Sequence, residues 1–163
     1  MLLEIAASIF CYDIWFYISH RMLHTRLLWA FHAQHHEKRE PTFWDAYYSH
    51  WFEAAFQSIG TFVPYLFISY GWLETVLILA FLNIRGMLRH ESRLTGWWSG
   101  IRHHIGHHQH PMYNYGEEWL DVLCGTMYMG DGGCWEGCWE GGMYGICGVV
   151  CGVVYYSYIW MCM

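Results

Sequence analysis

Charged residues are scarce in this sequence of 163 residues, at 13% of the chain, whereas a typical soluble domain carries roughly 25%. Lysine occurs once, at Lys38, and the net charge is −6. So little positive charge gives no cationic surface for phosphates, which argues against a nucleic-acid-binding role. Hydrophobic residues make up 55% of the chain, which is too much apolar surface for a disordered protein.

Several common chemical motifs are also missing. None of the seven cysteines stands in a Cys-x-x-Cys pair, so a zinc knuckle or dithiol redox pair is not expected, and the thiols are interpreted as reduced apolar side chains. No glycine-rich dinucleotide fingerprint is present, so electrons for a redox reaction must come from a separate donor. The apolar segment 1–19 lacks the basic start and cleavage site of a signal peptide.

Uncharged runs are present instead. Residues 54–73 contain no Asp, Glu, Lys or Arg, and residues 75–84 continue without charge after Glu74. As one helix, 54–84 would be roughly 46 Å long at ~1.5 Å per residue, which exceeds the ~30 Å hydrocarbon core of a bilayer. Because Pro64 and residues 69–71 offer places to bend, we expect an apolar hairpin of two spanning or half-spanning helices over about 54–84. A buried core hairpin of a soluble protein is the alternative.

Two polar, histidine-rich regions flank this hairpin, one within residues 1–50 and one within 85–126. An even number of membrane crossings between them would return the chain to the same face. The basic residues all lie in these regions: Arg21, Arg26, Lys38, Arg39, Arg85, Arg89, Arg93 and Arg102. Since basic residues favour the cytosolic side, the sequence predicts an all-α, multi-pass transmembrane helical bundle with a cytosolic histidine-rich helical cap, formed by residues 1–128.

Residues 129–163 form a low-complexity tail rich in Gly, Cys and Trp. Two tetrapeptides occur twice in tandem, Gly-Cys-Trp-Glu from Gly133 and Cys-Gly-Val-Val from Cys147. Residues 141–163 carry no charge and are long enough to form a C-terminal membrane helix. We assign no chemistry to this tail.

The twelve histidines need an explanation, because imidazole is costly to leave unpaired in an apolar setting. His20 and His24 are four residues apart and share one face of a helix. The pattern His-x-x-His-His occurs twice, as His32, His35 and His36 and as His104, His107 and His108. Pro111 then ends the second helix or forces a turn.

These eight imidazoles at helical spacing exceed what one four-coordinate zinc ion uses. They suit a pair of metals, and imidazole ligands fit Fe, Zn, Cu or Ni. Metal storage or transport is an alternative, although transporters usually place their ligands within the membrane spans. Polar helix faces that carry His without a metal are the structural alternative.

The histidines also fall into motifs that a known family shows in the same order. The motifs are Asp13-Ile-Trp-Phe-Tyr-Ile-Ser-His20-Arg-Met-Leu-His24, Phe31-His32-Ala-Gln-His35-His36-Glu37, Tyr48-Ser-His50-Trp-Phe-Glu53, His90, His104-Ile-Gly-His107-His108, Asn114-Tyr-Gly116, Trp119-Leu-Asp121 and Gly125-Thr126. Over about residues 10–128 the chain resembles the membrane-bound sterol desaturase and fatty acid hydroxylase superfamily, which includes sterol C5-desaturases and C4-methyl oxidases.

The resemblance implies a membrane-bound oxidoreductase in which two Fe ions use O2 to hydroxylate or desaturate a C–H bond of a sterol or fatty acyl lipid. The metal ligands that it implies are His20, His24, His32, His35, His36, His90, His104, His107 and His108. The resemblance also allows zinc in place of iron in purified samples. The implied partners are the lipid substrate, the lipid bilayer and an electron donor such as cytochrome b5 or a reductase. The implied location is the endoplasmic reticulum membrane of a eukaryote or the inner membrane of a bacterium.

Further residues are expected to surround the ligands. Asp13, Glu53 and Asp121 are candidates to orient ligand imidazoles through their second N–H. His50 precedes Glu53 in a motif that usually reads His-Pro-x-Glu. His103 and His110 are the other expected neighbours of the ligands. Some family branches carry a histidine at the position of Gly86, and either His103 or His110 would replace it. A non-catalytic metal-binding integral membrane protein and a purely structural membrane protein are the alternative functions.

Overall fold

The computed structural model describes residues 2–128, and every regular element in that range is a helix. This confirms the all-α prediction for the described part of the chain, whereas the predicted tail helix within 129–163 lies outside it. The elements are α1 (Leu2–Leu23), α2 (Trp29–His32), η1 (His35–Glu37), η2 (Phe43–Tyr47), α3 (Trp51–Phe62), η3 (Val63–Leu66), α4 (Trp72–Arg89), η4 (Ser92–Leu94), α5 (Ser99–Gln109) and α6 (Glu118–Leu123).

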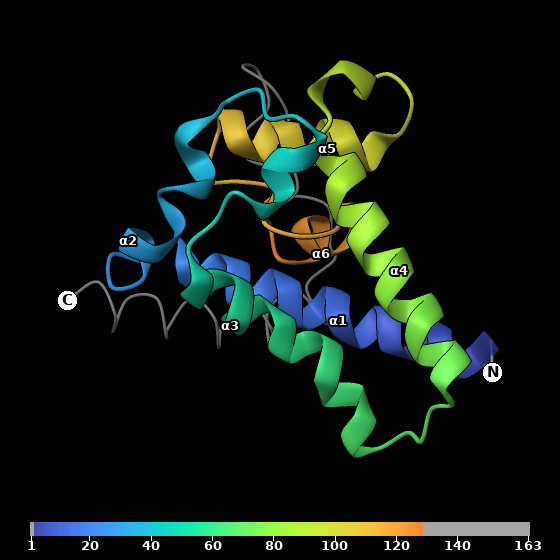
Figure 1. Ribbon diagram of the computed structural model, residues 1–163. Helices are drawn as coiled ribbons and strands as arrows, with labels where there is room; N and C mark the ends of the chain where they lie inside the picture. The colour runs from blue at the N-terminus through green and yellow to red at the C-terminus, as the bar shows by residue number, and fades with distance from the viewer. Residues whose placement is uncertain (1, 129–163) are drawn as a thin grey trace, which may run out of the picture.

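The long helix α1 crosses the middle of the molecule and packs against both α3 and α4 (Figure 1). The contact with α3 is close at Gly60, where an added Cβ would lie 2.5 Å from Cδ1 of Trp15. The indole Nε1 of Trp15 also donates to the carbonyl of Phe56 over 3.1 Å. A glycine at this crossing lets the two helix backbones approach, so α3 is fixed against the middle of α1.

The predicted apolar hairpin is a helical hairpin, with its reversal between α3 and α4. The chain turns through η3, which contains Pro64, and residues 67–71 before α4 begins at Trp72. α3 has 12 residues, about 18 Å of helix, which is too short for a ~30 Å hydrocarbon core. α3 alone is therefore too short to cross a bilayer, and the two-span version of the predicted hairpin is not confirmed.

Within residues 2–128, α1 is the one helix that is long and apolar enough to cross a membrane, judged by its 22 residues and composition. α4 has 18 residues but carries Glu74, Arg85 and Arg89. Both arginines are buried and reach charged partners inside the molecule.

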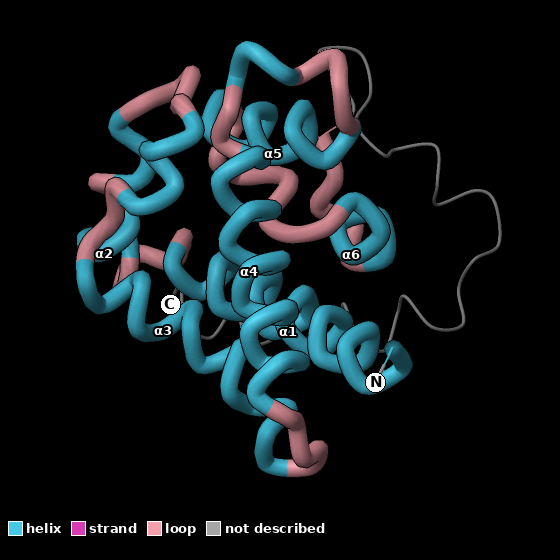
Figure 2. Tube along the Cα trace, turned by 45° about the vertical axis from the view of Figure 1, so that its right-hand side comes forward, coloured by secondary structure: helices cyan, strands magenta, loops and turns pink. Residues whose placement is uncertain are grey.

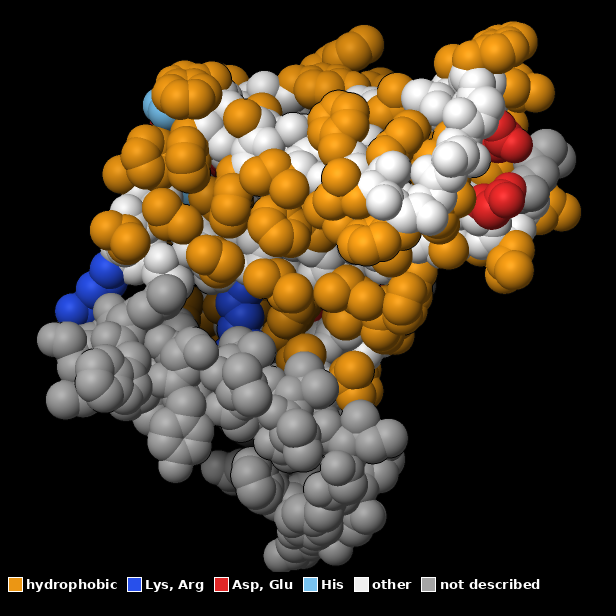
Figure 3. All heavy atoms as spheres, turned by 90° about the horizontal axis from the view of Figure 1, so that it is seen from below, with side chains coloured by type: hydrophobic (Ala, Val, Ile, Leu, Met, Phe, Trp, Pro, Cys, Tyr) orange, Lys and Arg blue, Asp and Glu red, His pale blue; other side chains and the backbone are white. Residues whose placement is uncertain are grey.

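The interior is more polar than the exterior. Eighteen polar or charged residues are buried in the described range but only eight hydrophobic ones, and the buried apolar cluster is confined to Tyr17, Tyr115 and Leu120 with two flanking residues. Large hydrophobic side chains are instead exposed along α1, α3 and α4. Seen from below, this side of the molecule is covered by hydrophobic side chains with few charges (Figure 3). Soluble proteins rarely expose such a continuous apolar surface.

The shorter helices form a cap over the C-terminal ends of α1 and α4. α5 lies across the top of the molecule, α2 lies at one side, and α6 lies between α5 and α1 (Figures 1 and 2). Both α5 and η2 contact α4. This arrangement brings the histidines of the N-terminal half and those of α5 to one place.

Candidate metal centre

The nine histidines that the sequence predicts as ligands lie together in two adjacent groups. Within each group, the nitrogen atoms that could bind metal all lie within 4.8 Å of one another. Group A is His20, His24, His32, His36 and His107, and group B is His35, His90, His104 and His108. Four separate segments contribute to them: the end of α1, α2 with η1, the residue after α4, and α5.

Each His-x-x-His-His motif contributes its first and last histidines to one group and its middle histidine to the other. In the first motif, His32 and His36 join group A and the intervening His35 joins group B. In the second, His104 and His108 join group B and the intervening His107 joins group A. Residues four apart share a helix face, whereas neighbouring residues point about 100° apart at 3.6 residues per turn. Each motif therefore serves both groups and fixes the distance between them.

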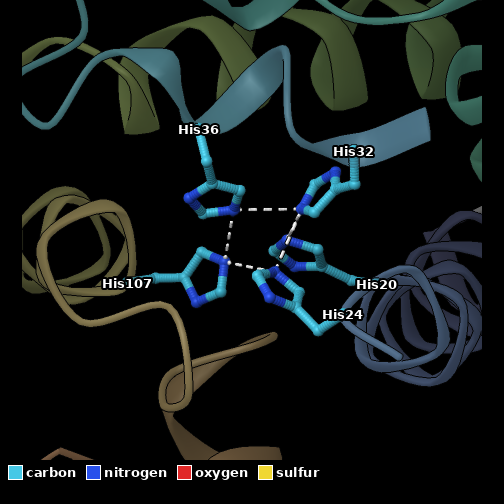
Figure 4. A group of neighbouring side chains, drawn as sticks. All are labelled: His20, His24, His32, His36 and His107. Atoms are coloured by element: carbon cyan, nitrogen blue, oxygen red, sulfur yellow. Dashed lines mark hydrogen bonds between the residues drawn. The ribbon is translucent and has the colours of Figure 1, made fainter. Parts of the chain in front are cut away.

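The Nε2 atoms of group A have the spacing of ligands around one ion (Figure 4). Four of them form a closed ring, in which consecutive Nε2 atoms lie 3.0, 3.0, 3.1 and 3.0 Å apart. The order around the ring is His24, His32, His36, His107 and back to His24. A square with this edge has its centre about 2.1 Å from each corner, which is the length of a metal–imidazole bond. His20 adds a fifth nitrogen, 3.0 Å from Nε2 of His32.

Partners on Nδ1 show which lone pairs point into group A. Nδ1 of His20 lies 2.5 Å from the carbonyl of Tyr115, and Nδ1 of His32 lies 2.9 Å from a carboxylate oxygen of Glu53. A neutral imidazole has one N–H, and the carbonyl acceptor requires that of His20 on Nδ1. The Nε2 lone pair of His20 then points toward Nε2 of His32 at 3.0 Å, an arrangement that a shared cation stabilises.

Group B repeats this pattern with different acceptors. Nε2 of His90 lies 3.0 Å from Nε2 of both His35 and His104. Nδ1 of His90 donates to the carbonyl of Gly86, and Nδ1 of His108 donates to the carbonyl of Lys38. Nε2 of His108 is buried and has no hydrogen-bond partner among the described residues. The donor set therefore fits a second transition-metal ion.

Burial keeps these imidazoles in the neutral form that metals bind. It lowers the pKa of His32 to about 3 and the pKa of His90 to about 4. Burial and the neighbouring histidines also lower the pKa values of His35 and His104 well below the usual range. At neutral pH the lone pairs are free for a metal, because protons do not compete for them.

Glu53, one of the carboxylates predicted to lie near the ligands, contacts His32. Its carboxylate contacts Nδ1 of His32 at 2.9 Å, which gives the carboxylate–histidine arrangement typical of metal sites. Burial raises the pKa of Glu53 to about 8. A metal ion bound to Nε2 of His32 would oppose this shift, because its positive charge favours the ionised carboxylate at neutral pH.

The expectation that Asp13 orients a ligand imidazole is wrong in this structure. Its carboxylate instead pairs with the guanidinium of Arg85. Arg85 and Arg89 both contact Glu117 as well. Since Asp13 lies two helical turns from His20 on α1, its side chain meets α4 before it can reach the histidines. No sequence motif indicates these partners, because they are distant in the chain.

The other expected neighbours lie outside both groups. His50 caps α3, with its Nδ1 accepting from the backbone N–H of Phe52, and His110 stacks on Tyr128. His103 contacts Asp121, with 2.9 Å between Nε2 and Oδ2. Asp121 therefore orients a histidine, but one outside the predicted ligand set. Sequence reasoning missed the backbone carbonyls that orient the ligands, because any residue type supplies a carbonyl.

Over residues 2–128, a helical fold with an apolar exterior and two largely buried all-imidazole groups defines a class of histidine-rich proteins suited to metal binding and to membranes. The fatty acid hydroxylase family model matches residues 5–126. The chain belongs to the fatty acid hydroxylase family.

Curated relatives carry sterol-modifying names. The chain is 26% identical over 126 residues to methylsterol monooxygenase 1 of Rattus norvegicus, covering 70% of this chain and 43% of that protein. It is 30% identical over 147 residues to methylsterol monooxygenase erg25B of Aspergillus fumigatus, covering 78% and 49%. It is 26% identical over 121 residues to the Delta(7)-sterol 5(6)-desaturase of Candida glabrata, covering 72% and 33%. The chain thus spans less than half the length of these relatives. No solved structure matches it.

Proposed function

We propose that this protein is a membrane-bound oxidoreductase that uses a dinuclear iron centre and O2 to hydroxylate or desaturate a C–H bond of a sterol or fatty acyl lipid. The observation that carries the proposal is the convergence of nine buried or half-buried imidazoles into a group of five and a group of four. Family membership and the names of the relatives support lipid oxidation as the reaction class.

The residues of this chain have separable roles in such a centre. Groups A and B would each hold one iron, and bound iron would supply the activation of O2 needed to break an unactivated C–H bond. The groups that contact Nδ1 would orient the imidazole rings. Glu53 contacts His32, and backbone carbonyls accept from His20, His90 and His108. The largely buried position of both groups limits the access of water, which protects the oxidising chemistry from side reactions.

The surface supports a location in the membrane and a lipid substrate. Exposed apolar side chains cover α1 and the hairpin, including Phe10, Phe62 and Phe81. We infer that these surfaces contact the hydrocarbon core, with α1 spanning it and α3 entering it partway, while the cap faces the cytosol. A substrate dissolved in the bilayer would then reach the metal groups from the membrane side.

The remaining partners follow from the resemblance. An electron donor such as cytochrome b5 or a reductase would supply electrons, since residues 1–163 contain no dinucleotide fingerprint. The membrane would be that of the endoplasmic reticulum in a eukaryote or the inner membrane in a bacterium.

The decisive experiment is metal analysis of the full chain purified in detergent and reconstituted anaerobically with ferrous iron. We expect two irons per chain, and none would contradict the proposal. Lipid profiling of cells with and without the gene then separates an oxidase from a non-catalytic metal-binding membrane protein. An oxidase changes a sterol or fatty acyl species and so identifies the substrate, whereas two bound irons with an unchanged lipid profile would support the non-catalytic alternative.

A further inference from the structure

The loop of residues 113–116, between α5 and α6, supplies the acceptors for two ligands of group A. The carbonyl of Tyr113 accepts from Nδ1 of His107 at 2.5 Å, and the carbonyl of Tyr115 accepts from Nδ1 of His20 at 2.5 Å. One of these histidines lies on α5 and the other on α1. The loop therefore connects two elements of group A that are far apart in the chain.

Group B uses no carbonyl of this loop in the contacts found within residues 2–128. His90 donates to Gly86 on its own helix, and His108 donates to Lys38. A change confined to the loop should consequently affect group A and leave the orientation of group B intact.

The carboxylate of Asp121 holds the conformation of this loop by accepting hydrogen bonds from its backbone. Its side chain is fully buried, and its two oxygens accept four hydrogen bonds. Oδ1 accepts from the backbone N–H of Tyr115 and from Oγ1 of Thr126, at 2.9 and 2.6 Å. Oδ2 accepts from the backbone N–H of Gly116 at 2.8 Å and lies 2.9 Å from Nε2 of His103. Two of the four donors are thus backbone groups of the loop itself.

The loop has little freedom to adopt another shape. Asn114 has a φ of 58°, a left-handed conformation that Asn tolerates better than most residues, and its N–H donates to the carbonyl of Thr126. At Gly116 an added Cβ would lie 3.0 Å from Cβ of Tyr17. Since Tyr17 precedes His20 by about one helical turn, the loop rests directly on the part of α1 that presents this ligand.

We propose that Asp121 is a positioning residue for group A, acting through the loop of residues 113–116. By holding the N–H groups of Tyr115 and Gly116, it fixes the carbonyls that orient His20 and His107. This inference rests on the proposed function, in which both groups bind iron. It differs from the usual contact between a carboxylate and a ligand histidine, because a backbone segment transmits the effect.

The test is iron content after anaerobic reconstitution of the full chain with ferrous iron. Asp121→Asn replaces one accepting oxygen with an NH2 group, so either Gly116 or Tyr115 loses its acceptor. We expect iron to fall from two to about one per chain. Glu118→Gln is the matched control, because it removes a carboxylate charge from the same short helix and should retain two irons.

Double variants assign the lost iron to a group. In a His108→Ala background, which disables group B, adding Asp121→Asn should remove the remaining iron. In a His107→Ala background, which disables group A, adding it should leave the remaining iron bound. A residue needed only for folding would remove iron in both backgrounds, and that result would overturn the inference.

A second variant keeps the inference testable if Asp121→Asn prevents folding. Gly116→Val pushes the loop away from Tyr17 without altering Asp121, whereas Gly96→Val adds a side chain where no atom lies within 4 Å. We expect only Gly116→Val to lower iron in group A. Full iron content in both Asp121→Asn and Gly116→Val would overturn the positioning role alone. A wild-type chain without iron would overturn the proposed function, and this inference with it.

Discussion

At the scale of single residues, neighbouring histidines have different roles. His107 and His108 are adjacent on α5, yet one belongs to group A and the other to group B. The spacing in the sequence indicated that the histidines share helix faces. It did not indicate that each motif divides between two sites, because that division depends on where the facing helices place their own imidazoles.

The first prediction uses this adjacent pair. His107→Ala and His108→Ala should each lower iron content from two to about one per chain, and the double variant should bind none. Iron analysis of the three purified proteins checks this. His110→Ala, whose imidazole stacks on Tyr128, is the control and should retain both irons. Loss of both irons in either single variant would contradict two independent groups.

The second prediction concerns Glu53. Glu53→Gln keeps the size of the side chain but removes the charge that faces Nδ1 of His32. Loss of such a partner typically weakens metal affinity by about 10–100-fold. Competition with a chelator measures the change, and Glu40→Gln at an exposed position serves as the control. Equal affinity in the two variants would argue against an orienting role for Glu53.

At the scale of elements, the crossing of α1 and α3 holds the apolar hairpin in place. Gly60 faces Trp15 so closely that no side chain fits without a shift of one helix. The sequence indicated an apolar segment and a bend near Pro64. It did not indicate which glycine lies at a crossing, since this depends on the relative rotation of the two helices.

The third prediction compares two glycines within helices. Gly60→Ala should destabilise the protein by about 1–3 kcal/mol, the usual cost of overpacking. Gly86→Ala meets no atom within 4 Å and should stabilise it by up to ~1 kcal/mol, because alanine favours helix over glycine. Thermal unfolding of both variants in the same detergent provides the measurement. Similar melting temperatures for the two would show that the α1–α3 contact is not tight.

At the scale of the whole molecule, the distribution of polarity is reversed relative to a soluble protein. Histidines and ion pairs fill the interior, while Phe, Trp and Leu side chains cover α1, α3 and α4. The buried ion pairs of Arg85 with Asp13 and Glu117 connect α1, α4 and the start of α6. The cap and the hairpin are therefore joined by polar contacts rather than by a large hydrophobic core.

The fourth prediction is a pH dependence of the whole molecule without metal. Unfolded histidine has a pKa of about 6.5, whereas burial lowers the pKa of His90 to about 4 and that of His32 to about 3. As the pH falls below about 6.5, the unfolded chain takes up protons that the folded chain does not, so the free energy of unfolding decreases. Once the pH is below both folded pKa values, these two groups cause no further decrease.

Thermal unfolding in detergent between pH 8 and pH 4 checks this dependence. His90→Gln removes one titrating group and should give a shallower decrease than the wild type. A melting temperature of the metal-free protein that stays constant from pH 7 to pH 4 would contradict it.

The sequence by itself determined the helical character of residues 2–128, the reversal of the hairpin near Pro64 and the histidines available as ligands. These follow from periodicity and side-chain chemistry, which are local properties. Only the tertiary structure decided how the nine histidines divide into five and four, that Asp13 pairs with Arg85, and that Asp121 accepts hydrogen bonds from the loop of residues 113–116. Each of these depends on the position of a partner remote in the chain, often a backbone carbonyl or N–H that every residue type carries.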